Sequence, residues 1–194
     1  MAISYPLTLP THTGVRNIEL RTTNAVSYSR SPFTFAGQAL LYPGQMWQAD
    51  FTLPPMRRAN AEQWVAWLVS LRGQYGTFLA GDTSCGSIQG TATTVAVTGS
   101  AGDNSVTVTS NGTLLAGDMI QIGTGADATL HKVLVDLDGN GTLEIWPALR
   151  KARSAVSVTL SNAKGLFRLA SNETSWSVNE ASFYGLSFSA MEAV

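Results

Sequence analysis

Apolar and polar residues alternate along most of this chain. From Trp47 to Leu53 the odd positions are apolar and the even positions are polar. A period of two places the apolar set on one face of a half-buried strand. The same alternation recurs at Ile18/Leu20, Val26/Tyr28, Phe33/Phe35, Val95/Val97, Val106/Val108, Ile120/Ile122, Val156/Val158/Leu160 and Tyr184/Leu186/Phe188/Ala190. Turn-forming stretches separate these runs, so the pattern predicts many short strands, as in a β-sandwich or β-barrel.

One segment, from about Arg57 to Arg72, has the period of a helix instead. The proline pair at 54–55 ends the strand before it, because proline cannot donate a ladder hydrogen bond. Gly73 follows, where a left-handed C-cap is expected. Trp67 lies off the apolar face, so the helix buries a second face, either in its own domain or against a neighbouring subunit. The apolar face itself consists of Ala61, Trp64, Val65, Leu68 and Leu71 or Arg72.

The composition changes twice along the chain. Residues 1–84 hold three of the five tryptophans, the stretch 85–162 has one tryptophan and no Phe or Tyr, and aromatic residues return from Phe167 onward. This order predicts an all-β fold: a β-sandwich domain of residues 1–84 and 163–194 carrying one helix (57–72), with a small β-barrel inserted at 85–162. The stretches 81–90 and 162–165 would be the two crossings, where the chain passes between the outer domain and the barrel. One continuous sandwich is the alternative.

Charged residues are scarce. They make up 13% of the chain, against roughly 25% in an average soluble domain. Twelve basic and thirteen acidic residues give a net charge of −1, without the clustered Lys and Arg that a nucleic-acid surface requires. We therefore expect no nucleic-acid binding. So few charges leave little to keep copies apart, which is typical of a surface covered in an assembly or of a merely uncharged Ser/Thr-rich β protein.

Targeting and redox signals are weak. No stretch approaches the ~20 apolar residues that a bilayer requires, so no membrane span is expected, and residues 1–10 lack the features of an export signal. Cys85 is the only cysteine, which excludes an intrachain disulfide and a cysteine-based zinc site. These observations favour folding in a reducing cytoplasm.

Residues 136–144 resemble the start of an EF-hand calcium loop. Asp136, Asp138 and Asn140 supply oxygen ligands at positions 1, 3 and 5, with glycine at position 6. Position 12, which should be a bidentate glutamate, is Pro147, and the flanks read as strands. Asp, Asn and Gly are also the residues of a hairpin turn, since they tolerate positive φ. We favour the turn over a weak cation site.

Catalytic chemistry has little support. The stretch Gly81–Gly86, which contains Ser84, lacks the G-x-S-x-G elbow of serine hydrolases. His12 and His131 are the only histidines that could act as a base, and both positions are typical of surface residues. Motifs for nucleotides, dinucleotides and HExxH zinc are missing from the sequence. We therefore predict no enzyme activity, no catalytic residue, no cofactor and no metal site.

Several stretches together resemble a known family. They are Tyr5–Pro10, Ser31–Phe35, Gln45–Met56, Ala61–Trp67, Ser70–Phe78, Ala116–Gly123, Leu143–Arg150 and Gly165–Leu169 with Trp176. This set is similar to tail proteins of siphophages and prophages, particularly the distal tail protein type. The stretches in the middle look like the small barrel that some of those proteins carry.

The resemblance implies a structural role in the virion. Proteins of this type have a β-sandwich belt domain with one helix and form hexameric rings between the tail tube and the tip or baseplate hub. The implied partners are copies of the chain, the tail-tube protein and hub proteins. The implied location is the tail tip of a virion whose proteins are made in the host cytoplasm. The inserted barrel would project outward or downward, toward fibres or sugars.

A carbohydrate- or receptor-binding tail module is the alternative function. Exposed aromatic side chains stack on sugars, and Trp146 and Trp176 are the candidates. We favour packing roles for both.

Overall fold

The computed structural model describes residues 3–11, 14–82, 86–180 and 182–194. The elements are β1 (Leu7–Thr8), β2 (Asn17–Arg30), β3 (Gly37–Thr52), β4 (Met56–Arg57), α1 (Arg58–Ser70), β5 (Thr77–Ala80), β6 (Val95–Gly99), β7 (Ser105–Ser110), β8 (Thr113–Leu114), β9 (Met119–Ile122), a 3₁₀ turn (Gly125–Asp127), β10 (Thr129–Val133), β11 (Leu137–Asp138), β12 (Gly141–Trp146), β13 (Arg153–Thr159), β14 (Gly165–Leu169), β15 (Trp176–Val178) and β16 (Phe183–Glu192).

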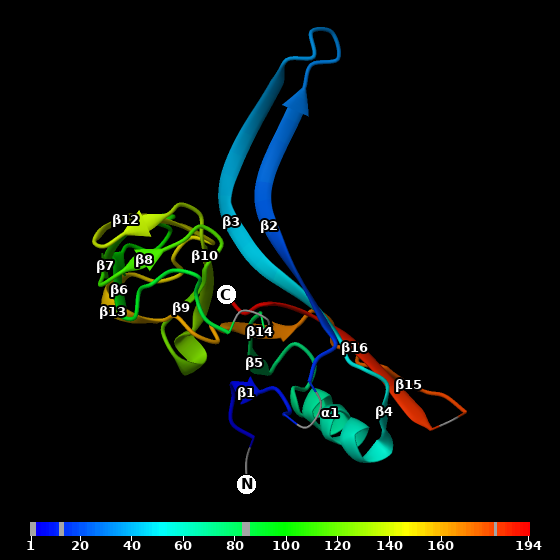
Figure 1. The fold of residues 1–194 in the computed structure, drawn as a ribbon. Helices are drawn as coiled ribbons and strands as arrows, with labels where there is room; N and C mark the ends of the chain where they lie inside the picture. Colours follow the sequence, from blue (N-terminus) through cyan, green and yellow to red (C-terminus); the bar gives the residue numbers. More distant parts are fainter. Residues whose placement is uncertain (1–2, 12–13, 83–85, 181) are drawn as a thin grey trace.

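The strands of the outer domain form one connected sheet, and β8 and β11 form a separate two-stranded sheet within the inserted stretch. The order of the outer sheet is β1-β5-β14-β16-β3-β2, with β15 and β4 pairing to the first part of β16. The C-terminal strand β16 is therefore central (Figure 1). The alternation at 47–53 becomes a register in which Phe51 lies opposite Phe188 and Ala49 opposite Ala190, and all four side chains are buried.

The helix covers the aromatic face of this sheet. Its buried residues include the predicted apolar face, and Leu71 just after the helix is also buried. The rings of Phe51 and Phe188 stack with centroids 4.7 Å apart. Trp67 meets Phe78 edge to face at 5.1 Å. Large aromatic side chains thus fill the space between helix and sheet, which is why this domain needs most of the aromatic residues.

A closed barrel interrupts the outer domain between β5 and β14. Six strands close it in the order β10-β12-β7-β6-β13-β9. Its own core consists of small aliphatic side chains, such as Val97, Val108, Ile120, Leu143 and Ile145. The Gly/Thr/Val-rich composition of this stretch follows from that small interior. The fold is all-β with one helix and an inserted small barrel, as predicted.

The two crossings between domain and barrel run side by side. Ser87 pairs with Ser161, and Asn162 donates its backbone N–H to the Gly86 carbonyl at 2.9 Å. A Cβ on Gly81 would overlap the carbonyl oxygen of Ala163, so only glycine allows this approach. Thr83, Ser84 and Cys85 lie outside the described residues, and the boundary at 84/85 stays a prediction.

A long two-stranded hairpin leaves the body of the protein (Figure 1). Near its base, Asn24 and Gln45 lie opposite one another and both contact the barrel. We call residues 25–44, beyond these two, the arm, and residues 31–36 its tip. At about 3.3 Å per residue, β2 extends about 20 Å from Asn24 to Arg30.

Candidate assembly surface

The arm has one apolar face. Val26 pairs with Leu41 and Tyr28 pairs with Ala39. Because β2 has no extra residue at its bulge, its even-numbered side chains stay on the face that Leu20 and its neighbours use to reach the core. Beyond the base nothing in the described chain covers this face: Tyr28 is 66% exposed and Leu41 is 68% exposed. The apolar face of the arm therefore has the residue pattern of a core-facing surface but is exposed in the described chain.

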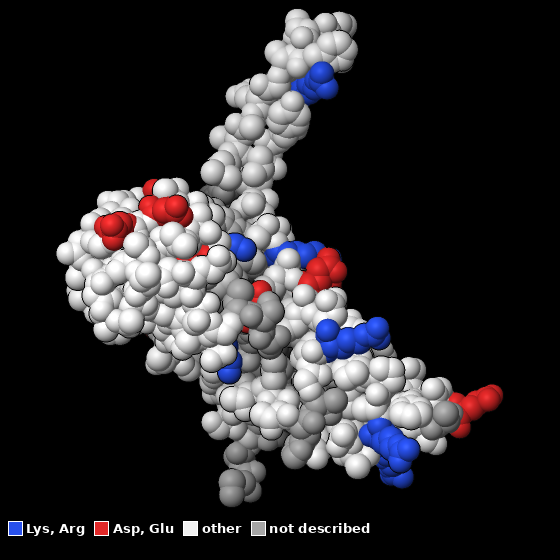
Figure 2. All heavy atoms as spheres, in the orientation of Figure 1, with Lys and Arg blue, Asp and Glu red and all other residues white. Residues whose placement is uncertain are grey.

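The other face of the arm is mostly polar. Ser27, Ser29 and Gln38 point to it, with Leu40 and Tyr42 as the large exceptions. Arg30 is the only charged residue in the arm. Figure 2 accordingly shows an arm almost free of charge, whereas the body carries both signs. The charges that would keep this hairpin apart from other chains are absent.

Both long edges of the arm are open. β2 ends the strand order of the sheet, so its outer edge has no partner strand in the described chain. On the other side, β16 pairs with β3 only as far as Gln48. The part of β3 in the arm therefore pairs with β2 alone. Natural proteins usually protect long edges with charges, prolines or covering segments, because an open edge pairs with other strands. The arm carries Arg30, Pro32 and Pro43 only.

A buried ion pair fixes the base of the arm to the barrel. Arg150, in the segment after β12, bonds the Glu192 carboxylate through Nη2 at 2.7 Å and through Nε at 3.2 Å. The same guanidinium donates to the Gln45 carbonyl at 2.6 Å. Glu192 also accepts the Trp47 backbone N–H at 3.1 Å. One cluster thus joins barrel, central strand and arm base.

Two tryptophans complete this junction. Trp47 donates its indole N–H to the Leu130 carbonyl of the barrel at 2.9 Å. Trp146 of the barrel packs edge to face on Trp47, with centroids 4.6 Å apart, and donates to Asn24 Oδ1 at 2.7 Å. Trp146 therefore has a packing role, as favoured from the sequence. The junction is continuous from the barrel to the arm, so the arm leaves the body in a defined direction.

The EF-hand-like stretch is organised as a turn. Asp136 Oδ1 accepts the Ala116 N–H at 2.7 Å, and Asn140 Oδ1 accepts the Ser110 N–H at 2.9 Å. Gly139 has φ of 68°, a conformation that glycine adopts without strain. Two of the three oxygen-bearing side chains are therefore occupied by backbone donors. Within the described residues, no three His, Cys, Asp or Glu side chains gather as metal ligands.

His131 is not a surface residue, contrary to the sequence prediction. It lies in the middle of β10 and is fully buried. Its ring nitrogens lie 2.7 Å from the Pro147 carbonyl, which Nδ1–H reaches as donor, and 2.8 Å from the Thr129 hydroxyl. The pKa of His131 is lowered to about 4, chiefly by burial; the Pro147 bond acts in the opposite direction, and the nearby Arg150 and Arg153 lower it too. This is a neutral, structural histidine.

The hydrolase-like stretch falls largely outside the described residues: Gly81 lies at the crossing, whereas Ser84 and the candidate base His12 are both outside them. Trp67 is buried in the core of its own domain. The subunit-contact alternative for the second helix face is therefore wrong for that side chain. Trp176, by contrast, is 45% exposed on β15, so its packing is partial.

Sequence reasoning missed the arm as a surface. Alternation predicted the strand at Val26/Tyr28, but the alternation at Phe33/Phe35 was wrong as a strand signal, because these residues form the turn at the tip. Alternation also does not tell whether the apolar face is covered. The scarcity of charge between Arg21 and Asp50 was the available signal.

Among the residues that the structure describes, the one α-helix is too short to cross a membrane. Comparison of the sequence with models of known families gives no match, and comparison with curated proteins gives none either.

Proposed function

We propose that this chain is a structural protein that assembles with copies of itself into a ring. The arm is the observation that carries the proposal: it combines an uncovered apolar face, two open strand edges and a single charge. A strand from another chain would satisfy the edge hydrogen bonds and cover the apolar face together. Head-to-tail contact of this kind produces a closed ring whenever the rotation between copies closes.

The two edges of the arm suit such a contact. The β2 edge is open on one side of the arm and the β3 edge on the other. Each arm can therefore contact two neighbouring copies, one along each edge. The rigid junction at Arg150 and Glu192 supports the same arrangement, because a fixed arm direction reduces the entropy lost on assembly.

The place of the ring rests on the family resemblance. Similarity to distal tail proteins supports a ring at the far end of a phage tail tube, in contact with tail-tube protein on one side and with tip or hub proteins on the other. A virion location follows from that role. The proposal includes no catalysis, in keeping with the absence of a catalytic motif in the sequence.

Light scattering across a concentration series, with negative-stain images of the same samples, tests the proposal. We expect closed rings of constant subunit number. Tyr28→Glu places a charge on the apolar face and should abolish the rings. Ser29→Glu places the same charge on the polar face one residue away and should be tolerated much better. A wild-type chain that stays monomeric at every concentration, also with tail-tube protein added, would refute the ring.

A carbohydrate-binding module is the second candidate, because Trp176 is half exposed beside hydroxyl-rich residues 171–175. A glycan array with wild type and Trp176→Ala tests it. Binding that the substitution abolishes would favour this candidate, and no binding would remove it.

A further inference from the structure

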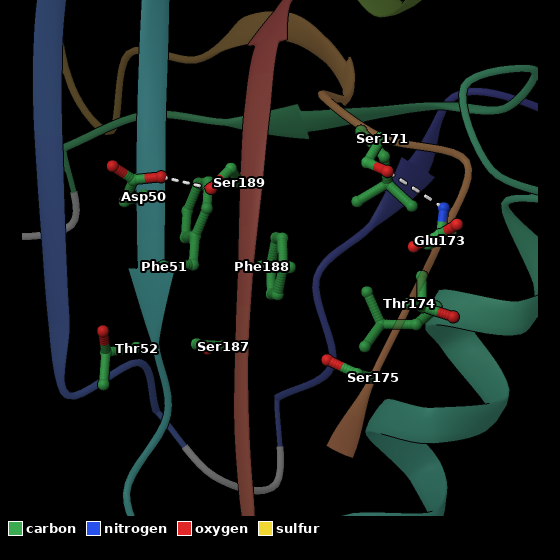
Figure 3. Close-up of a pocket in the computed structure, with 12 residues that line it drawn as sticks. Asp50, Phe51, Thr52, Ser171, Glu173, Thr174, Ser175, Ser187, Phe188 and Ser189 are labelled. Atoms are coloured by element: carbon green, nitrogen blue, oxygen red, sulfur yellow. Dashed lines mark hydrogen bonds between the residues drawn. The ribbon is translucent and has the colours of Figure 1, made fainter.

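A cavity of about 340 Å³ opens in the sheet beside the central strand (Figure 3). It exists because β14 and β15 pair with different parts of β16. β14 pairs with Ala190–Glu192 and β15 with Tyr184–Leu186, which leaves Ser187–Ser189 without a strand on that side. The segment 171–175 passes at a distance and forms the outer wall.

The cavity has an apolar floor and an acidic, hydroxyl-bearing rim. Leu68, Leu169 and Phe188 line the floor. Asp50 and Glu173 stand at the rim with several Ser and Thr hydroxyls (Figure 3). Asp50 is already bonded to Ser189 and Arg21. The Glu173 carboxylate has no basic partner in the described chain, and its residue is exposed. The cavity thus suits an apolar group next to a cation.

The tip of the arm presents that combination. Phe33 is 91% exposed. Its position is fixed by a tight turn in which Ser31 Oγ accepts the backbone N–H of Phe33 at 3.3 Å and Ser31 N–H bonds the Ala36 carbonyl at 2.9 Å. The Arg30 guanidinium lies 4.6 Å over the Phe35 ring and donates through Nε to the Phe35 carbonyl. Its outer nitrogens remain available for a carboxylate.

We propose that the arm tip of a second copy inserts Phe33 into this cavity, with Arg30 beside Glu173 at the rim. The proposal rests on the ring function above and identifies the site on the neighbouring copy that receives the arm. We call Phe33 the knob and the cavity its socket. A cavity of about 150 Å³ already accommodates benzene, so 340 Å³ holds a phenyl ring with room for its backbone turn. The chain cannot fill its own cavity, because Asp50 lies near the end of β3 within the sheet, whereas the arm extends away from the body at the other end of β3 (Figure 1).

The fit also explains why the occupant is a copy of this chain. Head-to-tail assembly requires two different, complementary patches on one molecule. The arm has one charge, which is positive, and the cavity rim has one acidic side chain, Glu173, without a basic partner in the described chain, since Asp50 is bonded to Arg21. Knob and socket therefore match in polarity and sign.

Two variants and their mixture test the insertion. Phe33→Ala removes the knob, and Ser187→Trp fills the socket from an exposed lining position. Val69→Ala, an exposed apolar residue on the outer side of α1, is the matched control. Circular dichroism verifies that each variant is folded. We expect each of the first two to weaken self-association at least tenfold and the control to leave it unchanged.

The mixture gives the decisive readout. A Ser187→Trp copy keeps its knob and a Phe33→Ala copy keeps its socket, so one contact forms per pair and assembly ends at heterodimers. Rings that form normally from both variants would overturn the insertion while leaving the ring function intact. A wild-type chain that never self-associates would overturn both.

Discussion

The ion pair between Arg150 and Glu192 gives a quantitative test of the junction between barrel and outer domain. Glu192→Gln keeps the size of the side chain but removes its charge. The side chains of Arg150 and Glu192 are 15% and 4% exposed, so the substitution leaves a nearly buried guanidinium without its counter-charge. Breaking a buried pair in this way costs about 3–5 kcal/mol. We take about 3 kcal/mol, since Arg150 retains some contact with water.

A matched control is available on the helix. Arg58 and Glu62 form an ion pair at 3.5 Å with both side chains mostly exposed. Such a pair contributes roughly 0.3–0.5 kcal/mol, so Glu62→Gln should be nearly silent. In a chain of this size, 3 kcal/mol corresponds to a fall in Tm of about 6–12 °C, from about 2–4 °C per kcal/mol. Thermal and urea denaturation monitored by circular dichroism measure both variants.

Replacing both partners separates the worth of the pair from the penalty of an orphaned charge. Arg150→Met with Glu192→Gln leaves no buried charge, so the double variant should lose much less stability than the sum of the two single variants. The reasoning fails if Glu192→Gln costs no more than Glu62→Gln, or if the two single effects simply add.

Three further predictions concern single sites. Trp67→Ala should lower the free energy of unfolding by about 3–5 kcal/mol, because the side chain fills the aromatic core; a loss below 1 kcal/mol in denaturant titrations would contradict its burial. His131 has a pKa of about 4 when folded and 6.5 when unfolded, so acid favours unfolding: stability should be complete above about pH 6.5 and fall by roughly 3 kcal/mol toward pH 4. His131→Gln should flatten that part of the pH–stability curve, and an unchanged slope would exclude this histidine as its origin. Gly81→Val should displace the crossing at Ala163 and lower Tm, whereas Gly86→Val, where a Cβ meets open space, should not.

Much of the fold was accessible from the sequence because its periods are clear. The alternation at 47–53 matches the observed register, and the helix begins and ends within two residues of its predicted bounds. The shift from aromatic to Val/Thr-rich composition locates the barrel, since the two cores differ in size. The strand and helix periods and the change in composition depend on residues close together in the chain, so they can be recognised without knowing the tertiary contacts.

His131 shows where such signals stop. β9 and β10 lie between two cores: Met119 and Leu130 belong to the outer core, and Ile120 and Val133 to the barrel core. A strand covered on both faces buries consecutive side chains, so a polar residue there looks like a surface residue in sequence. The arm is the opposite case. Val26 and Tyr28 alternate like core residues, yet their face is open, because alternation within a strand carries no information on whether another segment covers it.

The central place of β16 also bears on how the chain is made. During synthesis the barrel strands emerge as one continuous stretch, and they can close before the outer sheet has its middle strand. The sheet, and with it the anchored base of the arm, is complete only when Glu192 has reached Arg150 and Trp47. A chain truncated before Glu192 would thus expose an arm without a fixed direction, and we expect it to be excluded from assembly. Because β16 follows the barrel in the chain, the arm is anchored only after the barrel has been made.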